Sequence, residues 1–330
     1  MYLTFPYPEI YPVDIPDKNI TAFLKPKETE HTEKSEEEVI KDGLRNPIGS
    51  PPISQIVKKG QKILILVDDY TRSTPTNTIL PQVINKLRAA GISHNNITLL
   101  IASGTHRKMT LQEKIKKYGS SIVTNYPIKD HLWNNAREIV QLPKTRNGTE
   151  IWVNKALLNA DFIIGVGHIV PHRVSGFSGG CKIVQPGVCG AVTTGQTHWL
   201  SALFDGPEIM GKIDNPVREE INEVGIKAGL KFIVNPVLDG EGHMVHCLCG
   251  APVEAHREGC RRAMEVFGAH LSEKADIVIA DSYPADMELW QASKGIYSAD
   301  LALKPGGVIM LVTPCPEGIS SEHPKIMEFG

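Results

Sequence analysis

The chain has 330 residues, of which 41% are hydrophobic and 22% are charged, and its formal net charge is -2. This length is too great for one ordinary hydrophobic core and predicts two domains, while the near-neutral charge argues against nucleic acid as a partner. No apolar stretch is long enough to span a bilayer, and the N-terminal segment lacks the basic and apolar regions of a signal peptide, so we expect neither a membrane association nor secretion.

Strands and helices are predicted to alternate in the first third of the chain. The charged segment 28–47 predicts a surface helix, and the apolar runs in 62–67 and 97–107 predict buried strands. A helix is expected over 79–91, where a glycine stands at the C-cap, and a shorter helix over 111–119. Strand, helix and strand in this order are typical of a parallel α/β sheet.

The same alternation continues in the middle of the chain. The apolar segments 161–167 and 231–235 predict two more strands, and 251–270 carries the clearest amphipathic helical pattern. We therefore expect residues 1–270 to form an N-terminal α/β domain with a parallel-rich sheet.

A second α/β domain is predicted from residue 271 onward. The segments 276–282 and 307–312 predict strands, and the stretch 286–304 between them predicts a helix. Residues 271–330 would be small for an independently folding domain, so we expect them either to be the start of a truncated domain or to depend heavily on the first domain. The predicted fold is thus two α/β domains with a ligand cleft between them.

Reactive side chains follow three of the predicted strands. In open parallel sheets, ligands gather at the carboxyl ends of the strands. A polar residue after one strand often only caps the next helix, but three such groups at one sheet edge predict a functional site. The groups are Asp68, Asp69, Thr71 and Arg72 after the first strand, Ser103, Thr105, His106 and Arg107 after the second, and His168, His172 and Arg173 after the third.

The segment 171–187, PHRVSGFSGGCKIVQPG, is too rich in glycine for a core strand or a stable helix. It is not a Walker loop, because Lys182 is followed by Ile183 rather than a hydroxyl residue, and it lacks GxGxxG. What remains is a nest of backbone amides for one phosphate, beside a lysine that could act as a nucleophile or form an imine.

Two histidine patterns leave alternatives open. His168 and His172 have the spacing of two zinc ligands on a helix, but Pro171 disfavours a helix there, so we interpret His168 as structural and His172 as a functional candidate. His198, which precedes Trp199, is either a ligand at the same crevice or an ordinary core or surface residue.

The six cysteines are too sparse for a disulfide scaffold and form no pair of CxxC motifs. Cys247 and Cys249 are the closest couple, and CxC alone is a weak metal signal. We interpret all six as reduced thiols, as is usual in the cytoplasm.

Together these motifs resemble the nickel-dependent lactate racemase family, whose members interconvert the two hands of 2-hydroxy acids. The resemblance extends over nearly the whole chain. It rests on DDYTR (68–72), SGTHR (103–107), the long segment 171–187 and QTHW (196–199). The long glycine-rich motif is highly specific, and the shorter motifs occur in the order and spacing of the family.

The resemblance implies a covalently attached nickel-pincer nucleotide, a pyridinium mononucleotide that bears thioamide and thiocarboxylate groups. It implies that Lys182 carries this cofactor through its thioamide and that His198 is the protein's nickel ligand. It also implies partners that assemble the cofactor. Residues that would line the cofactor are Asp69, Tyr70, Thr71, Arg72, Gly179 and Gly180.

The resemblance further implies that His106 and His172 are the two catalytic bases. A secondary alcohol without an acidic C–H is inverted most easily by oxidation to a planar 2-oxo acid and reduction from the other face. Hydride would move to the pyridinium ring and back, and a base on each side of the carbinol would exchange the hydroxyl proton. Arg72 would hold the substrate carboxylate.

In the second predicted domain, Gln291 and Lys294 are three residues apart, so on a helix they share a face. The resemblance implies that both bind the substrate, which is lactate or a related small 2-hydroxy acid. The resemblance implies a smaller aromatic residue at Trp290 in lactate-specific members, and Trp290 either packs locally or alters which substrate fits. Family members continue well beyond residue 330.

Two other functions are compatible with the same residues. A non-catalytic protein could bind a phosphorylated ligand in the glycine-rich loop, and a metal-dependent hydrolase could use His168 and His172. The first would tolerate loss of His106 and His172, and the second would stay active without Lys182.

Overall fold

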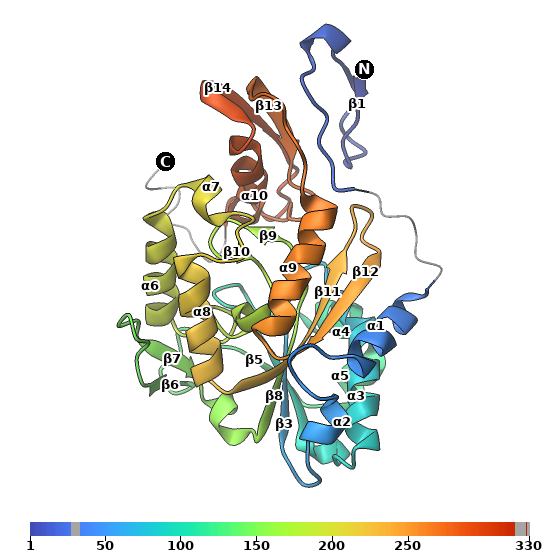
Figure 1. Ribbon diagram of the computed structural model, residues 1–330, viewed down its shortest axis with the longest axis vertical. Coiled ribbons are helices and arrows are strands. Elements are labelled where there is room, and N and C mark those ends of the chain that lie inside the picture. Colours follow the sequence, from blue (N-terminus) through green and yellow to red (C-terminus); the bar gives the residue numbers. More distant parts are fainter. Residues whose placement is uncertain (28–33, 321–327, 329–330) are drawn as a thin grey trace. The chain divides into compact units, whose positions relative to one another are not determined.

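The computed structural model describes residues 1–27, 34–320 and 328, and the chain divides into two compact units (Figure 1). The larger unit is Lys27–Phe267, and the smaller combines Met1–Pro26 with Gly268–Gly330. The sequence predicts that residues 1–270 form one domain, whereas the structure groups the first 26 residues with the C-terminal segment. The physical basis of this grouping includes Tyr7, a buried residue whose hydroxyl lies 3.4 Å from Ser282 Oγ.

A six-stranded sheet forms the centre of the larger unit, in the order β12-β11-β8-β3-β4-β5. Only β12 is antiparallel to its neighbour, so the expected parallel-rich α/β sheet is confirmed. The strands are β3 (Ile63–Val67), β4 (Ile97–Ile101), β5 (Ile128–Asp130), β8 (Phe162–Val166), β11 (Leu230–Leu238) and β12 (Met244–Gly250).

The strand order reverses between β3 and β8. From β3 the chain moves outward through β4 to β5, and it then returns to place β8 on the other side of β3, followed by β11. In open α/β sheets, such a switch point is where ligands bind, at the carboxyl ends of the strands. We therefore expect ligand-binding residues in the loops that follow β3 and β8.

Helices cover both faces of this sheet (Figure 1). Several begin at clear capping signals: Ser35 and Glu38 form a capping box at α1, Thr110 and Glu113 form one at α4, and Asn215 caps α8. The helices are α1 (Glu36–Arg45), α2 (Ile53–Ile56), α3 (Thr76–Ala89), α4 (Leu111–Tyr118), α5 (Ser120–Asn125), α6 (Ala191–Ala202), α7 (Gly206–Ile209), α8 (Pro216–Lys227) and α9 (Glu254–Phe267).

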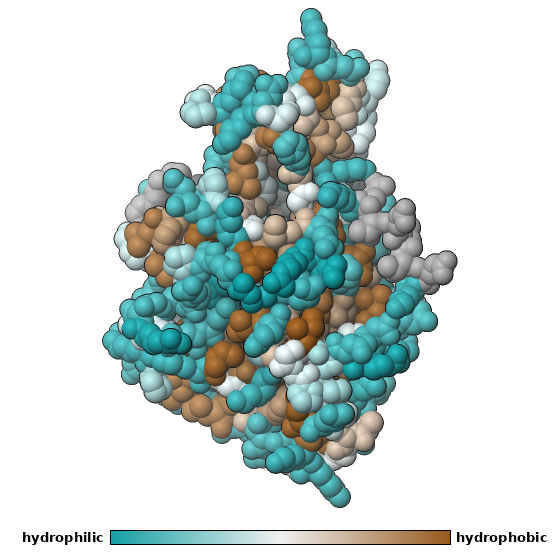
Figure 2. Space-filling view, in the orientation of Figure 1, coloured by the Kyte–Doolittle hydropathy of each residue, from teal (hydrophilic) through white to brown (hydrophobic). Residues whose placement is uncertain are grey.

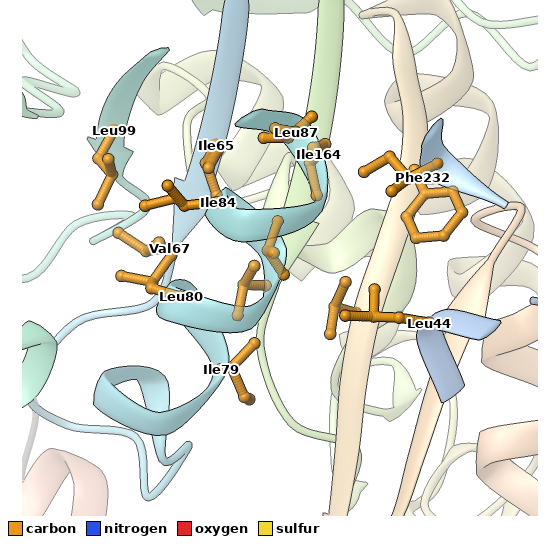
Figure 3. Packing of buried hydrophobic residues seen from close by; sticks show 14 of the residues in the cluster. Leu44, Ile65, Val67, Ile79, Leu80, Ile84, Leu87, Leu99, Ile164 and Phe232 are labelled. Atoms are coloured by element: carbon orange, nitrogen blue, oxygen red, sulfur yellow. The ribbon is translucent and has the colours of Figure 1, made fainter. Parts of the chain in front are cut away.

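Alternate residues of β3 enter two separate cores, because successive side chains of a strand point to opposite faces. Ile65 and Val67 pack against α3, as Figure 3 shows with Leu80 and Ile84, whereas Leu66 belongs to the core that includes α8. Full burial of each such side chain stabilises the fold by about 1.5–3 kcal/mol. Packing on both faces holds β3 in place, and with it the start of the loop that follows the strand.

Smaller elements complete the larger unit. A hairpin of β6 (Ile139–Leu142) and β7 (Ile151–Asn154) precedes β8. Two short antiparallel strands, β9 (Pro171–His172) and β10 (Gly176–Phe177), lie in the glycine-rich segment, and a 3-10 turn follows them at Gly180–Ile183. This confirms that the segment is neither a core strand nor a long helix.

The smaller unit contains a β-α-β arrangement. Strands β13 (Ala275–Asp281) and β14 (Leu303–Val312) are parallel and are connected by α10 (Leu289–Asp300), while β1 (Tyr2–Leu3) and β2 (Val13–Asp14) pair antiparallel. The predicted strands and helix of the second α/β region are confirmed. Strand β14 begins earlier than predicted. Pro305 and Gly306 suggest a turn before the strand, but an edge strand tolerates proline and glycine.

The predicted elements of the larger unit are present with shifted ends. Over 28–47, a helix forms at α1, and residues 28–33 of that prediction lie outside the described part of the chain.

Polar side chains cover most of the face in Figure 2, with apolar groups scattered between them. Among the described residues, no helix has the length and hydropathy needed to cross a bilayer.

Candidate functional site

The three predicted groups of reactive side chains meet at one sheet edge. They follow β3, β4 and β8, which are adjacent and parallel, so their carboxyl ends lie side by side. The prediction of a shared edge is confirmed. The loops after β3 and β8 additionally flank the switch point.

Asp69 and His106 form the closest ionisable pair at this edge. His106 Nδ1 lies 2.6 Å from Asp69 Oδ2, while Asp69 Oδ1 accepts from Thr71 N at 3.0 Å and from Thr71 Oγ1 at 2.6 Å. Because a carboxylate only accepts, Nδ1 of His106 is the donor and the lone pair of the neutral ring lies on Nε2. The pair is arranged as an oriented base.

The charge on Asp69 is set by its neighbours. Burial alone would raise the pKa of this carboxyl, but His106, Arg72 and the Thr71 hydroxyl outweigh burial and hold the pKa well below its usual range. Asp69 is therefore a carboxylate at any physiological pH. An imidazolium formed at His106 would be stabilised by this fixed charge.

Asp68 is linked to a second histidine, His168, through the hydroxyl of Thr74. Thr74 Oγ1 donates to Asp68 Oδ2 and lies 2.9 Å from His168 Nδ1, and His168 Nδ1 is 3.9 Å from Asp68 Oδ2. Burial, followed by the charges of Arg72 and Lys117, lowers the pKa of His168, although Asp68 opposes that shift. These contacts agree with the interpretation of His168 as a structural residue.

Helix α4 holds the loop after β3. Lys117 Nζ lies 3.2 Å from Asp68 Oδ1 and donates to the carbonyl of Thr74 at 2.9 Å and to that of Arg72, while the hydroxyl of Tyr118 donates to Asp68 O at 2.9 Å. Sequence reasoning missed Lys117 because its helix showed only a surface pattern. No local signal marks a lysine that binds a loop 43 residues away.

Tyr70 is braced from the side. The guanidinium of Arg107 lies 4.1 Å from the centre of the Tyr70 ring and donates to Glu113 Oε1 and Oε2 at 2.8 and 3.0 Å. Arg107 lowers the pKa of Glu113 to about 2, with smaller contributions from Thr110. The loops after β3 and β4 are thus tied together on this side.

The glycine-rich segment folds back on the rest of the unit. A Cβ at Gly179 would lie 2.6 Å from Ile169 Cγ1, and one at Gly180 would lie 2.7 Å from the His256 ring. The amide of Gly180 donates to Asn235 Oδ1 at 2.8 Å. These two glycines are therefore required for internal packing, and any phosphate nest would use amides other than that of Gly180.

Lys182 lies on the 3-10 turn that follows. Burial, followed by the charges of Arg72 and Arg218, holds the pKa of this lysine well below its usual value, and Asp69 opposes the shift. By solvent-accessible area the side chain is only partly buried. An amine with a lowered pKa in a partly exposed position suits a nucleophile.

His172 and Arg173 occupy the first strand of the loop and the turn after it. The amide of Val174 donates to His172 Nδ1 at 3.1 Å, which places the proton of the neutral ring on Nε2. Arg173 Nη2 donates to the Phe204 carbonyl at 2.8 Å, whereas its buried Nη1 has no partner among the described residues. Such a donor is a natural contact for a bound anion.

His198 lies in α6, an element that the sequence did not predict. Its Nδ1 donates to the Thr194 carbonyl at 2.8 Å, so the lone pair of the neutral ring is on Nε2, as in a histidine that binds a metal. Gln185 of the glycine-rich segment donates to Thr197 Oγ1 and contacts the Thr193 carbonyl at 3.4 Å. The helix and the loop of Lys182 are thereby joined.

Gln291 and Lys294 lie in the smaller unit, on α10. Lys294 Nζ donates to Gln291 Oε1 at 2.5 Å, which confirms that the two side chains share a helix face. Gln291 is buried and Trp290 is partly exposed.

No group of three or more His, Cys, Asp and Glu side chains is positioned to hold a metal in the described part of the chain. All six cysteines are free, in agreement with reduced thiols. His168 contacts Asp68 and Thr74, which agrees with a structural role rather than with the zinc-ligand role of the hydrolase alternative.

Comparison with known proteins gives a consistent result. A family model described as the lactate racemase N-terminal domain matches residues 9–209, and one described as the lactate racemase C-terminal domain matches residues 271–325. A lactate racemase of Thermoanaerobacterium thermosaccharolyticum is 31% identical over 313 residues, which cover 94% of this chain and 73% of the relative. A lactate racemase of Lactiplantibacillus plantarum is 31% identical over 297 residues, which cover 89% and 70%.

Two solved structures are also similar. The lactate racemase apoprotein of Thermoanaerobacterium thermosaccharolyticum superposes with a TM-score of 0.83 at 32% identity, covering 94% of this chain and 73% of that one. A Thermotoga maritima protein superposes with a TM-score of 0.69 at 27% identity, covering 83% and 70%.

Proposed function

The chain belongs to the lactate racemase family, and from that premise we propose that it racemises lactate or a related 2-hydroxy acid. It is an isomerase of the racemase class. The observation that supports this most directly is the buried carboxylate of Asp69 against His106 Nδ1, at the sheet edge where the charges of Asp69 and Arg72 also act on Lys182.

The residues present fit a nickel-pincer nucleotide. Lys182 would carry it, because an amine with a lowered pKa can form the covalent link, and His198 would bind the nickel through Nε2. The remaining metal ligands would come from the cofactor, since the described residues offer no complete metal site. Asp69, Tyr70 and Thr71 would line it, with Gly179 and Gly180 shaping the loop.

When bound, the cofactor supplies an electron-poor ring that accepts and returns hydride. The protein supplies proton transfer and orientation. His106 accepts the hydroxyl proton of one hand of the substrate, and Asp69 stabilises the resulting imidazolium. His172 is the proposed second base, for the other hand; in that role its Nδ1 gives up the Val174 amide and its ring carries the lone pair on Nε2. Arg72 holds the carboxylate while the carbinol end turns.

Gln291 and Lys294 would bind the substrate from the smaller unit. Their mutual hydrogen bond presents an ammonium and an amide side by side, a combination suited to a carboxylate and a hydroxyl. The partners are then a small 2-hydroxy acid and the enzymes that assemble the cofactor, and the unpaired cysteines support a reducing, cytoplasmic location.

The proposal is tested by producing the protein together with the cofactor-assembly enzymes. We expect stoichiometric nickel, a mass increment located on Lys182 by peptide mapping, and conversion of either lactate enantiomer to the racemate. Lys182→Ala should lack the increment and the activity. Protein that carries neither nickel nor an increment and racemises no 2-hydroxy acid would contradict the proposal.

A further inference from the structure

Arg218 is a buried cation that contacts the backbone of the glycine-rich segment. It lies in the first turn of α8 and is 3% exposed. Its Nε donates to Ser175 O at 3.2 Å, its Nη1 to Gly179 O at 3.3 Å and its Nη2 to Phe177 O. One guanidinium therefore binds three alternate carbonyls of a five-residue turn.

Only arginine can make this set of contacts. The planar fork points several donors in fixed directions, whereas the single nitrogen of a lysine could not reach three carbonyls spread over five residues. Burial lowers the pKa of Arg218 to about 10, which still leaves it charged near neutral pH. No carboxylate among the described residues pairs with it, so the carbonyl dipoles stabilise the charge.

The contacts lead directly to Lys182. Gly179 O, which accepts from Arg218, also accepts from the amide of Lys182 at 3.2 Å. The turn is held from the other side as well, because a Cβ at Gly176 would lie 2.0 Å from Lys212 O, in the segment that leads into α8. Arg218 thus lies between α8 and the backbone that orients Lys182.

The charge of Arg218 acts on the same lysine. Three charged groups affect the protonation of Lys182: Arg72 and Arg218 disfavour the ammonium, and Asp69 favours it. Burial acts in the same direction as the two arginines. Arg72 is also expected to bind substrate, whereas Arg218 is enclosed in protein and is available for no other task.

We propose that Arg218 is a positioning residue that fixes the 175–179 turn and keeps Lys182 a nucleophile, ready for attachment of the cofactor. The inference rests on the proposed role of Lys182. Its chemistry can nevertheless be measured on the protein without cofactor.

The test is competitive acylation with acetic anhydride over a range of pH, with peptide mass spectrometry to follow Lys182 and the exposed Lys59. Arg218→Gln removes the charge but keeps a donor, and Arg218→Lys keeps the charge but loses the fork. In Arg218→Gln the labelling midpoint of Lys182 should rise by about one pH unit, a tenfold loss of labelling below both midpoints. In Arg218→Lys it should rise less.

Hydrogen exchange reports the turn itself. In both variants the peptide containing residues 175–180 should exchange faster, while that of β3 should not. Arg257→Gln is the matched control, because Arg257 forms a partly exposed ion pair with Asp214 and should change neither measurement. If Arg218→Gln does not fold, Arg218→Lys alone decides: unchanged exchange of the turn would refute the proposal.

An unchanged Lys182 midpoint in folded Arg218→Gln would equally overturn it. These outcomes are separate from those of the proposed function. A shifted midpoint together with no cofactor on wild-type Lys182 would leave the role of Arg218 intact and remove the racemase chemistry.

Discussion

At the scale of the residue, the two oxygens of Asp69 have different tasks. Oδ1 accepts two hydrogen bonds from Thr71, and Oδ2 faces His106 Nδ1. In Asp69→Asn, the amide oxygen would stay with the two Thr71 donors and the amide nitrogen would face the histidine. An N–H donor at that place favours the tautomer of His106 whose Nε2 is protonated and cannot act as a base.

We therefore expect Asp69→Asn to lower kcat about 100- to 10,000-fold, the usual range for loss of a general base. Circular dichroism of lactate during turnover would measure this, with nickel content and thermal unfolding close to wild type. Asp276→Asn is the control, because Asp276 forms an exposed pair with Lys304. Wild-type kcat in Asp69→Asn would show that the Asp69–His106 contact has no catalytic role.

A second residue-scale prediction concerns His131, which is 2% exposed and held as a neutral ring. Its Nε2 donates to Cys189 O at 2.9 Å, and Asn154 Nδ2 donates to its Nδ1 at 3.2 Å. Burial lowers the pKa of His131 to about 4. Below the ordinary histidine pKa of about 6.5, the unfolded chain binds a proton that the folded chain does not, so stability falls between these two values.

Between pH 7 and 5.5 this one group should cost about 1 kcal/mol of unfolding free energy. Chemical denaturation at several pH values should show that loss reduced in His131→Gln. Val153→Ala, which opens a cavity in the same core without removing a titratable group, should keep the wild-type pH dependence. Identical pH profiles for wild type and His131→Gln would contradict the assignment.

At the scale of the element, replacing each of two helical glycines by alanine should change the stability of the protein in opposite directions. A Cβ at Gly225 of α8 would lie 2.5 Å from Cys181 Cβ, whereas one at Gly195 of α6 would meet nothing within 4 Å. Gly225→Ala should destabilise the protein by about 1–3 kcal/mol by overpacking. Gly195→Ala should stabilise it by about 0.5–1 kcal/mol, the helix propensity difference.

Equilibrium denaturation of the two variants decides this prediction, with each serving as the control for the other. Because Cys181 precedes Lys182, we also expect Gly225→Ala to reduce the fraction of protein that carries a mass increment on Lys182. Equal stability changes would mean that α8 can move away from the 3-10 turn without cost.

The elements also show what local sequence can predict. Strands β3, β4 and β8 were predictable because each is a short apolar run bounded by polar residues, and their common direction followed from the intervening helices. The polar residues at their carboxyl ends could therefore be grouped from the amino-acid sequence alone. Helix α6 was missed because its buried face is made of Thr193, Thr197 and Ser201 rather than apolar residues.

Long-range contacts escaped prediction for a different reason. Lys117 binds the carbonyls of Arg72 and Thr74, and Arg218 binds carbonyls 39 to 43 residues away, but neither pattern differs locally from a surface charge. Conversely, Gly179 and Gly180 were predicted to face a ligand, and the structure shows that their lack of side chains also serves close contacts with Ile169 and His256.

At the scale of the whole molecule, the candidate residues lie in two different compact units. Every residue proposed to hold the cofactor lies in Lys27–Phe267, whereas Gln291 and Lys294 lie in the unit that also contains Met1–Pro26. Sequence could place the second α/β region but not the return of the first 26 residues to it. That grouping depends on contacts such as Tyr7 with Ser282, which are 275 residues apart.

This division predicts that cofactor loading and substrate binding can be separated by mutation. Lys294→Met removes the ammonium beside Gln291, in the unit that does not contain Lys182. We expect the nickel content and the mass increment on Lys182 to remain at wild-type levels, while kcat/KM for lactate falls about 100-fold or more, as for loss of a charged contact to a carboxylate worth about 3 kcal/mol.

Lys304→Met is the matched control, since Lys304 lies in the same unit and forms an exposed pair with Asp276. Its kinetics and its cofactor content should both match wild type. Loss of the Lys182 increment in Lys294→Met would place the smaller unit in cofactor binding, and unchanged kinetics would remove Lys294 from the site. Retained cofactor with impaired turnover is the result that assigns the larger unit to the cofactor and α10 to the substrate.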